Sequence, residues 1–217
     1  MIIAIDGGAA TGKTTIAKKL SKKINFIHLN SGLLYRGITY ILLENDLLNK
    51  SDEFYVDFLK KIDFNISGDE YDIISYNNHD ITCQLHNKNI ADNIKYISNN
   101  IIIRNYITNL QREISTNINI VCEGRDIGTV VFPFADCKFF LKANIDVRVE
   151  RRYKQYLKNN IKIDKQKIKQ MLLDRDYNDT NRNISPLKKA KDSIVLNTSN
   201  KSIDEQIAII VEKINKG

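Results

Sequence analysis

Short apolar runs alternate with amphipathic stretches along most of the chain. The apolar runs are Ile2–Asp6, Phe26–Leu29, Ile118–Glu123, Lys138–Leu141 and Ile194–Asn197. The stretches with helical spacing are Thr14–Lys23, Gly32–Leu43, Ile101–Ser115, Asp146–Lys158, Lys165–Tyr177 and Asp204–Ile214. Strands that alternate with helices form a parallel sheet covered on both faces. The pattern therefore predicts an α/β fold with a parallel five-stranded sheet flanked by helices.

Residues 61–85 interrupt this alternation. Three short strand-like segments, Asp63–Ser67, Tyr71–Tyr76 and Asp80–Leu85, are separated by turn residues at Gly68-Asp69 and Asn77-Asn78. This spacing predicts a small antiparallel meander in a lobe inserted into the α/β core. Farther along, residues 148–182 are highly charged and helical, which suits a lid better than a packed core helix.

The first apolar run leads directly into a glycine-rich segment, residues 7–15, that reads Gly7-Gly8-Ala9-Ala10-Thr11-Gly12-Lys13-Thr14-Thr15. The pattern G-x-x-x-x-G-K-T between a strand and a helix is typical of a phosphate-binding loop, whereas the alternative is an ordinary glycine-rich turn. Its glycines let backbone N–H groups turn toward phosphate oxygens, Lys13 can reach the outer phosphates, and the Thr14 hydroxyl can ligate Mg²⁺. The helix that follows directs its positive dipole end toward the same anion. We therefore expect ATP and Mg²⁺ as cofactors.

Composition narrows the class of protein further. The 217 residues carry a net charge of +7, but Lys and Arg are spread along the chain with acids between them. A nucleic-acid-binding protein would need clustered lysines and an aromatic platform, and the chain has no tryptophan. The three cysteines (83, 122 and 137) lie far apart without a C-x-x-C motif, which favours reduced thiols. We expect a cytoplasmic monomer without a membrane or nucleic-acid partner, since no apolar run is long enough to span a bilayer.

Arginine-rich motifs follow the phosphate loop in sequence order. They are Ser31-Gly-Leu-Leu-Tyr35-Arg36, Glu123-Gly124-Arg125-Asp126-Ile-Gly-Thr-Val-Val-Phe132, Arg148-x-x-Arg151-Arg152 and Arg175-Asp176-x-x-Asp179-x-x-Arg182. An enzyme that transfers a phosphoryl group from one nucleotide to another must hold two polyanions end to end, and arginine side chains bind phosphate oxygens bidentately. Residues 7, 30 and 124 all fall at carboxyl ends of predicted strands, so they can meet in one cleft. Glu123 ends its apolar run, where a carboxylate for Mg²⁺ belongs in such an enzyme.

Together with the phosphate loop, these motifs closely resemble bacterial cytidylate kinases over almost the full chain. The string from Gly124 to Phe132 is the most specific part, because adenylate and thymidylate kinases share the phosphate loop but lack this string. The resemblance implies transfer of the γ-phosphoryl group of ATP to CMP, and to dCMP. It also implies a phosphate-loop core of residues 1–30, 100–147 and 183–217, an acceptor-binding lobe of residues 31–99 and a lid of residues 148–182.

The resemblance further implies a role for individual residues. Lys13, Arg148 and Arg152 act on the transferring phosphoryl group, and residues 7–15 bind ATP. Asp126 accepts a hydrogen bond from the exocyclic amine of cytosine. Uracil has a carbonyl oxygen at that position, which cannot donate and is repelled by a carboxylate. Residues implied to bind the acceptor are Ser31, Arg104, Asp126 and Arg182 at the base, Arg175 and Asp179 at the ribose, and Tyr35, Arg36 and Arg125 near the phosphate. Thr14 and Glu123 are implied to hold the metal.

Several of these residues also have an interpretation without a ligand. Judged without their motifs, Arg36 and Arg104 would be ordinary surface residues of helices. The arginines at 148, 151 and 152 can form a solvated helix face, and Arg175 can form an i, i+4 ion pair with Asp179. The chain also departs from the family: Gly8 replaces a proline, Asn30 an aspartate, His86 an arginine and Lys95 a serine. These departures affect substrate preference, so a UMP- or dTMP-preferring kinase is the nearest alternative.

Overall fold

The computed structural model describes residues 1–68 and 70–215. Within them the chain divides into two compact units. We call residues 1–26 and 121–217 the phosphate-loop unit and residues 27–120 the inserted unit. The predicted turn at Gly68-Asp69 and the last two residues of the predicted core fall partly or wholly outside the described residues.

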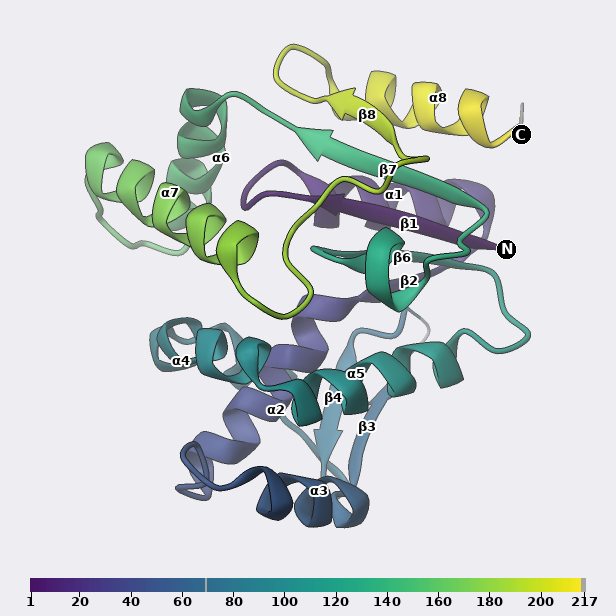
Figure 1. The fold of residues 1–217 in the computed structure, drawn as a ribbon. Helices are drawn as coiled ribbons and strands as arrows, with labels where there is room; N and C mark the ends of the chain where they lie inside the picture. Colours follow the sequence, from purple (N-terminus) through teal and green to yellow (C-terminus); the bar gives the residue numbers. More distant parts are fainter. Residues whose placement is uncertain (69, 216–217) are drawn as a thin grey trace. The chain divides into compact units, whose positions relative to one another are not determined.

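A five-stranded sheet organises the chain, as the alternation of apolar runs predicts. Its strands are β1 (Ile2–Gly7), β2 (Ile27–Asn30), β6 (Ile120–Gly124), β7 (Cys137–Lys142) and β8 (Ile194–Asn197), in the order β2-β6-β1-β7-β8. β1 pairs in parallel with β7 from Ile3 opposite Cys137 to Gly7 opposite Leu141, and β7 pairs in parallel with β8. The expected parallel sheet is confirmed (Figure 1).

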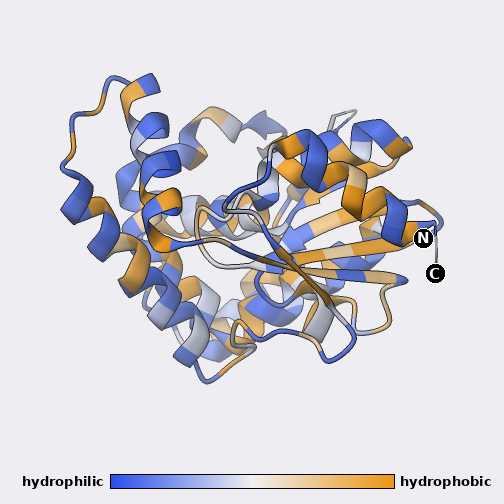
Figure 2. Cartoon of the chain, turned by 90° about the horizontal axis from the view of Figure 1, so that it is seen from above, coloured by the Kyte–Doolittle hydropathy of each residue, from blue (hydrophilic) through white to orange (hydrophobic). Residues whose placement is uncertain are grey.

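The phosphate-loop unit carries the helices α1 (Lys13–Ile24), α6 (Ile145–Lys158), α7 (Lys165–Asn181) and α8 (Ile203–Ile214). Helices α1 and α8 pack against its strands, whereas α6 and α7 pack against each other and against the phosphate loop. The core of this unit joins Ile3 and Ile5 of β1, Leu20 of α1, Phe139 of β7 and Ile210 of α8. Figure 2 shows the consequence of this burial, with apolar strands inside and helices that carry one apolar and one polar face. No helix in the described part of the chain is long and apolar enough to cross a membrane.

The inserted unit is mostly helical and has its own apolar core. Its helices are α2 (Ser31–Glu44), α3 (Asp52–Lys61), α4 (Lys88–Asn99) and α5 (Ile101–Ile114). The core gathers buried aliphatic side chains such as Leu34, Ile38, Leu85 and Ile103. Helices α3 and α4 were not predicted from the sequence pattern, although Ser51 and Asn87 provide side-chain caps at their N-termini.

The predicted antiparallel meander is present, but its last strand is shorter than expected. β3 (Phe64–Ser67), β4 (Ile73–Tyr76) and β5 (His79–Asp80) form a three-stranded sheet. The prediction of a strand over Asp80–Leu85 is wrong beyond Asp80, where the chain turns into a 3₁₀ helix from Thr82 to His86. The Asp80 carboxylate accepts from the Thr82 amide at 2.8 Å, and this local bond competes with strand pairing.

Candidate active site

The phosphate loop joins the end of β1 to the start of α1. Gly7 and Gly12 have φ angles of 152° and 98°, which side chains with a Cβ rarely adopt. A Cβ on Gly7 would also lie 2.5 Å from the Leu141 carbonyl oxygen on the neighbouring strand β7. The two glycines are therefore required by the path of the loop, and α1 begins at Lys13 directly behind it.

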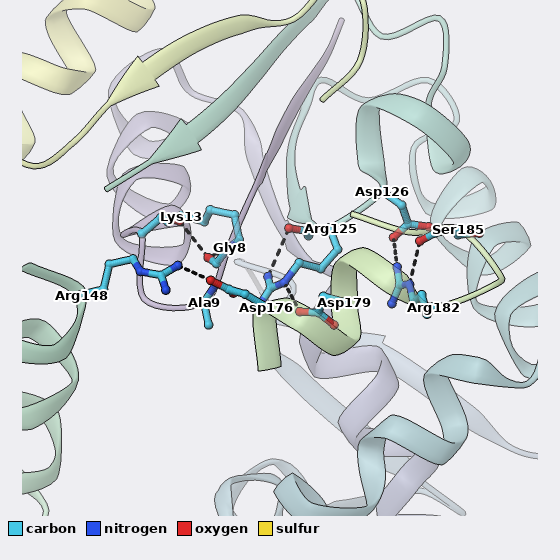
Figure 3. A network of polar contacts seen from close by, with 12 residues as sticks. Gly8, Ala9, Lys13, Arg125, Asp126, Arg148, Asp176, Asp179, Arg182 and Ser185 are labelled. Carbon is cyan, nitrogen blue, oxygen red and sulfur yellow. Dashed lines mark hydrogen bonds and ion pairs between the residues drawn. The ribbon is translucent and has the colours of Figure 1, made fainter. Parts of the chain in front are cut away.

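Lys13 is buried and turned toward its own loop. Its ammonium donates to the Gly8 carbonyl oxygen at 2.8 Å, and the Thr11 hydroxyl donates to the same oxygen at 3.0 Å (Figure 3). Burial, with Arg125 adding a like charge, lowers the pKa of Lys13 to about 7, although Glu123 opposes the shift. A polyphosphate beside this ammonium would favour its charged form again.

Thr14 and Glu123 form the oxygen-rich corner of the site. The Thr14 hydroxyl donates to Glu123 Oε1 at 2.6 Å, so the end of β6 touches the first turn of α1. Mg²⁺ prefers oxygen ligands and is usually held by one or two carboxylates together with substrate phosphates. No group of three or more His, Cys, Asp and Glu side chains suited to a metal occurs among the described residues. This pair of oxygens therefore fits a magnesium ion that arrives with a nucleotide.

The three arginines of the Arg148-x-x-Arg151-Arg152 motif lie on α6 but have different partners. Arg148 donates from Nη1 to Asp176 of α7. Arg151 donates to the Thr11 carbonyl at 3.0 Å and to the Thr198 carbonyl at 2.6 Å, so it ties α6 to the phosphate loop and to the end of β8. Arg152 donates to Gln155 on its own helix at 2.9 Å. Arg148 is 7% exposed, and it is the arginine that approaches the start of the loop most closely.

Asp176 was part of a motif in the sequence but had no assigned role. Its Oδ1 accepts from the Ala9 amide at 2.9 Å, while its Oδ2 accepts from Arg148 (Figure 3). A carboxylate of α7 is thus bound to a backbone N–H of the phosphate loop. Only the tertiary structure reveals this contact, because Ala9 and Asp176 are 167 residues apart.

Arg125 and Asp179 form a partly buried ion pair between the end of β6 and α7. Arg125 Nε donates to Asp179 Oδ2 at 2.8 Å. Burial raises the pKa of Asp179, but the charges of Arg125 and Arg175 outweigh it and the pKa lies below its usual value. Burial lowers the pKa of Arg125, but the negative charges of Asp179 and Glu123 outweigh this effect, so the pKa lies above its usual value. Both groups are therefore held in their charged forms.

Asp126 and Arg182 form a second pair that is more deeply buried. Their side chains are 5% and 6% exposed, and Arg182 Nη2 lies 3.4 Å from Asp126 Oδ1. Arg182 Nε also donates to the Ser185 carbonyl at 2.7 Å (Figure 3). The phosphate-loop unit therefore places Arg125, Asp126, Asp179 and Arg182 in two neighbouring ion pairs. The other acceptor residue predicted in this unit, Arg175, lies on α7, and its charge lowers the pKa of Asp179.

Asp6 supports the loop that carries Arg125 and Asp126. It is buried at the end of β1, and its two carboxylate oxygens accept from the Ile127 amide at 2.9 Å and the Gly128 amide at 2.8 Å. These amides begin the π-helical turn η2 (Ile127–Val131). Burial raises the pKa of Asp6 to about 6, although both amides oppose the shift. The sequence signal for this supporting role of Asp6 is weak, because it consists only of an acidic residue at the end of an otherwise apolar run.

The other predicted acceptor residues belong to the inserted unit. Ser31 is the first residue of α2 and is buried, and Arg36 on the same helix donates to the Leu85 carbonyl at 2.9 Å. Arg104 of α5 donates to the Ser98 carbonyl at 3.0 Å and lies 5.4 Å from the ring centre of Tyr35. The predicted acceptor residues are thus divided between the two units. Their binding roles stay predictions.

A phosphate loop after the first strand of a parallel sheet, with a Thr14–Glu123 pair beside it and arginines on α6, defines a phosphate-loop kinase. The chain belongs to the cytidylate kinase family, whose model matches residues 3–216. The cytidylate kinase of Fusobacterium nucleatum subsp. nucleatum is 41% identical over 216 residues, which are 100% of this chain and 98% of that protein. The cytidylate kinase of Carboxydothermus hydrogenoformans is 38% identical over 217 residues, with 100% and 98% covered.

Solved structures resemble the chain in fold. An uncharacterized protein from Eubacterium ventriosum superposes with a TM-score of 0.57 at 14% identity, over 100% of this chain and 99% of the other. An identity this low supports the fold alone. The family membership rests on the sequence matches, which confirm the predicted resemblance to cytidylate kinases and make the chain an enzyme of that family.

Proposed function

We propose that the chain transfers the γ-phosphoryl group of ATP to CMP, giving ADP and CDP. The observation that carries this proposal is the match to cytidylate kinases across residues 3–216. The same pocket would take dCMP, provided that the ribose 2′-hydroxyl contributes little to binding.

The donor nucleotide is assigned to the phosphate loop, residues 7–15. The buried Lys13 is expected to exchange the Gly8 carbonyl for phosphate oxygens when ATP binds, because a charged ammonium gains far more from a phosphate than from a neutral carbonyl. Arg148 and Arg152 on α6 are assigned to the same polyphosphate. Among the described residues Arg152 donates only to Gln155 on its own helix, so turning toward a ligand breaks a single hydrogen bond.

The acceptor is assigned to residues of both units. Arg36 and Arg125 would hold the CMP phosphate with support from Tyr35, and Arg175 with Asp179 would hold the ribose. Ser31, Arg104, Asp126 and Arg182 would surround the base. The buried Asp126–Arg182 pair supports this reading, because a fixed carboxylate can accept from the cytosine amine and repels the uracil carbonyl.

The chemistry needs no general base in the protein. The attacking oxygen of the CMP phosphate is already ionised at neutral pH, so the enzyme must align two polyanions and neutralise their charge. Lys13 and the arginines supply that charge from fixed positions. Thr14 and Glu123 would hold Mg²⁺, which neutralises phosphate charge when it is bound. With ATP held by residues 7–15, the phosphate oxygen of CMP could then approach the γ-phosphorus of ATP.

Domain roles and location follow from this assignment. Residues 148–182 would act as a lid over the donor, residues 31–99 as the acceptor lobe, and residues 1–30, 100–147 and 183–217 as the core. Exclusion of water by such closure prevents loss of the phosphoryl group to hydrolysis. A cytoplasmic monomer fits the reaction, because ATP and nucleoside monophosphates are cytoplasmic metabolites and each chain carries every predicted site residue.

An acceptor screen tests the proposal. The purified chain is incubated with ATP and Mg²⁺ and with CMP, dCMP, UMP, dTMP or AMP, and ADP formation is followed in a coupled assay. We expect CMP to give the highest kcat/KM. A preference for UMP or dTMP would replace the proposed acceptor, and ADP formation that is independent of any monophosphate would overturn the kinase assignment. Omission of Mg²⁺ in the presence of a chelator tests the metal separately.

A further inference from the structure

The guanidinium of Arg148 has one nitrogen that is hydrogen-bonded and one buried nitrogen that is not. Its Nη1 is bound to Asp176, while its Nε is buried and has no hydrogen-bond partner among the described residues. Leaving a buried guanidinium N–H unpaired is costly, so such a group indicates a ligand that completes it. The unpaired Nε belongs to a side chain that approaches the phosphate loop, and an anionic oxygen is the acceptor that best suits it.

Asp176 fixes this guanidinium to the phosphate loop. One of its carboxylate oxygens takes Nη1 of Arg148, and the other takes the Ala9 amide at 2.9 Å (Figure 3). The carboxylate is 24% exposed, whereas the Arg148 side chain is 8% exposed. Ala9 also packs in an apolar cluster with Val149 of α6 and with Ile168 and Leu172 of α7. Helices α6 and α7 are therefore held to the loop both by the Asp176 bridge and by apolar packing.

The bridge needs a residue without a side chain at position 8. A Cβ on Gly8 would lie 2.9 Å from Nη1 of Arg148 and 3.0 Å from Oδ1 of Asp176. At these distances the guanidinium must shift and the carboxylate must give way by a few tenths of an ångström. Gly8 has no positive φ, so a substitution there tests the space without straining the backbone. Glycine thus leaves the space in which the Arg148–Asp176 pair lies.

We propose that Asp176 is a positioning residue for phosphoryl transfer, which holds Arg148 over the phosphate loop in the space left by Gly8. In this arrangement Nη1 is occupied and the Nε edge remains for an oxygen of the donor polyphosphate. The inference rests on the proposed function, because it assigns Arg148 to the donor. Asp176 itself acts through Arg148 and touches no reacting atom.

The test compares Asp176→Asn with Asp174→Asn. Asparagine can still accept from the Ala9 amide through its carbonyl oxygen, but its amide group cannot accept from Arg148 in place of the lost carboxylate oxygen. We expect kcat to fall about tenfold to a hundredfold, with the KM values for ATP and CMP changed by less than about threefold, since a charge-assisted bond that acts in the transition state is lost. Asp174 is an exposed carboxylate two residues away on α7 that accepts from Gln170, so its substitution should leave kcat unchanged.

Two single substitutions, each also combined with Asp176→Asn, separate positioning from general damage. Arg148→Ala should lower kcat at least as far as Asp176→Asn, and the double variant Asp176→Asn/Arg148→Ala should lose no more than Arg148→Ala alone. Gly8→Ala should lower kcat because it displaces the Arg148–Asp176 pair. Adding Asp176→Asn to Gly8→Ala should then lower kcat by a smaller factor than Asp176→Asn does in the wild-type background. Thermal melting confirms that each variant is folded.

The outcomes distinguish this inference from the proposed function. Wild-type protein without CMP kinase activity would overturn the proposed function itself. An active wild type with normal kcat in Asp176→Asn, or with fully additive losses in the double variant, would overturn the positioning role. Calorimetric titration with ADP provides a readout without turnover: tighter ADP binding by Asp176→Asn together with unchanged kcat would mean that the carboxylate only competes with phosphate for the loop.

Discussion

The buried carboxylates at the end of β1 and after β6 have different tasks, although they lie in one small region. Asp6 accepts two backbone amides and holds the turn η2, whereas Asp126 pairs with Arg182 and is assigned to the cytosine base. A group that binds only backbone contributes to stability, and a group that faces a ligand contributes to selectivity. Substitutions at the two positions therefore need different measurements.

Asp126→Ala tests selectivity. Removing the carboxylate deletes the acceptor for the cytosine amine and the repulsion of the uracil carbonyl, so discrimination between CMP and UMP should fall by about 1–3 kcal/mol. The measurement is the ratio of kcat/KM for the two acceptors in the coupled assay. The KM for ATP should stay close to the wild-type value, and an unchanged CMP/UMP ratio would show that Asp126 serves only Arg182.

Asp6→Asn tests the pH dependence of stability. The pKa of Asp6 is about 6 in the folded chain and 3.8 as the ordinary value, so between these values the folded state binds the proton more tightly than the unfolded state. Stability from this group is therefore fully present below about pH 4 and is lost as pH rises through 6, by about 3 kcal/mol in total. Urea unfolding of wild type and variant between pH 4 and 7 gives the difference, which should decline by that amount. A difference that is flat or that grows with pH contradicts the assignment.

Lys95→Ser tests a departure from the family. Lys95 is exposed on α4, and its ammonium lies 5.0 Å from the ring centre of Tyr96, so it does not supply the hydroxyl that the resemblance implies at this position. Serine should raise the CMP/dCMP ratio of kcat/KM about fivefold to tenfold if one neutral hydrogen bond to the ribose is restored. The matched variant is Ser98→Ala on the same helix. A fall of the ratio in Ser98→Ala, with no change in Lys95→Ser, would assign the hydroxyl to Ser98 instead.

At the scale of elements, short apolar runs and helical periodicity predicted most of the α/β core. All five strands of the sheet coincide with predicted apolar runs, including β8, which is largely exposed, and the helices that follow them begin and end within a few residues of the predicted limits. The meander failed at Asp80–Leu85, because a side-chain bond from Asp80 to the Thr82 amide and the burial of Leu85 favour a 3₁₀ turn. Helices α3 and α4 lie outside the strand–helix alternation on which the prediction depended.

Ser202→Ala tests the last helix as an element. Ser202 and Glu205 form a capping box at the start of α8, in which the Ser202 hydroxyl accepts from the Glu205 amide at 3.2 Å and the Ser202 amide donates to Glu205 Oε2 at 2.6 Å. Alanine should lower the free energy of unfolding by about 1 kcal/mol. Ser202→Asp keeps an acceptor at the cap and should stay within a few tenths of a kcal/mol of wild type in chemical denaturation. Equal losses in both variants would point to packing rather than capping.

At the scale of the whole molecule, the sequence indicates candidate residues for binding nucleotide phosphates but not the contacts that support these residues in the fold. The loop from Gly7 to Thr14 is a local motif, so its residues could be read directly. The contacts of Asp6 with Gly128, of Arg151 with Thr198 and of Asp176 with Ala9 join residues far apart in the chain. Such contacts depend on the packing of complete elements, and a single sequence without a structure does not reveal them.

Nucleotide binding should stabilise the molecule measurably. The phosphate loop, Glu123 and the arginines of α6 all lie in the phosphate-loop unit, so ATP with Mg²⁺ binds only when this unit is folded. At a free concentration about a hundredfold above Kd, ATP should add about 2.7 kcal/mol and raise Tm by about 5–10 °C. Thermal melting with and without ATP measures the shift, and Lys13→Ala serves as the control that should reduce it. An equal shift in that variant would place the nucleotide elsewhere.

Asparagine occupies many of the left-handed turns of this chain. Asn25, Asn77, Asn78, Asn117 and Asn160 have φ between 49° and 62°, a region that asparagine tolerates better than most residues. Asparagine codons are rich in A and T and glycine codons in G and C, so a coding sequence that drifts toward A and T can exchange glycine for asparagine at such turns. Gly7 and Gly12, at φ of 152° and 98°, lie beyond that region. Asparagine can therefore serve in the turns at φ near 55°, whereas the phosphate loop can be built only with glycine at positions 7 and 12.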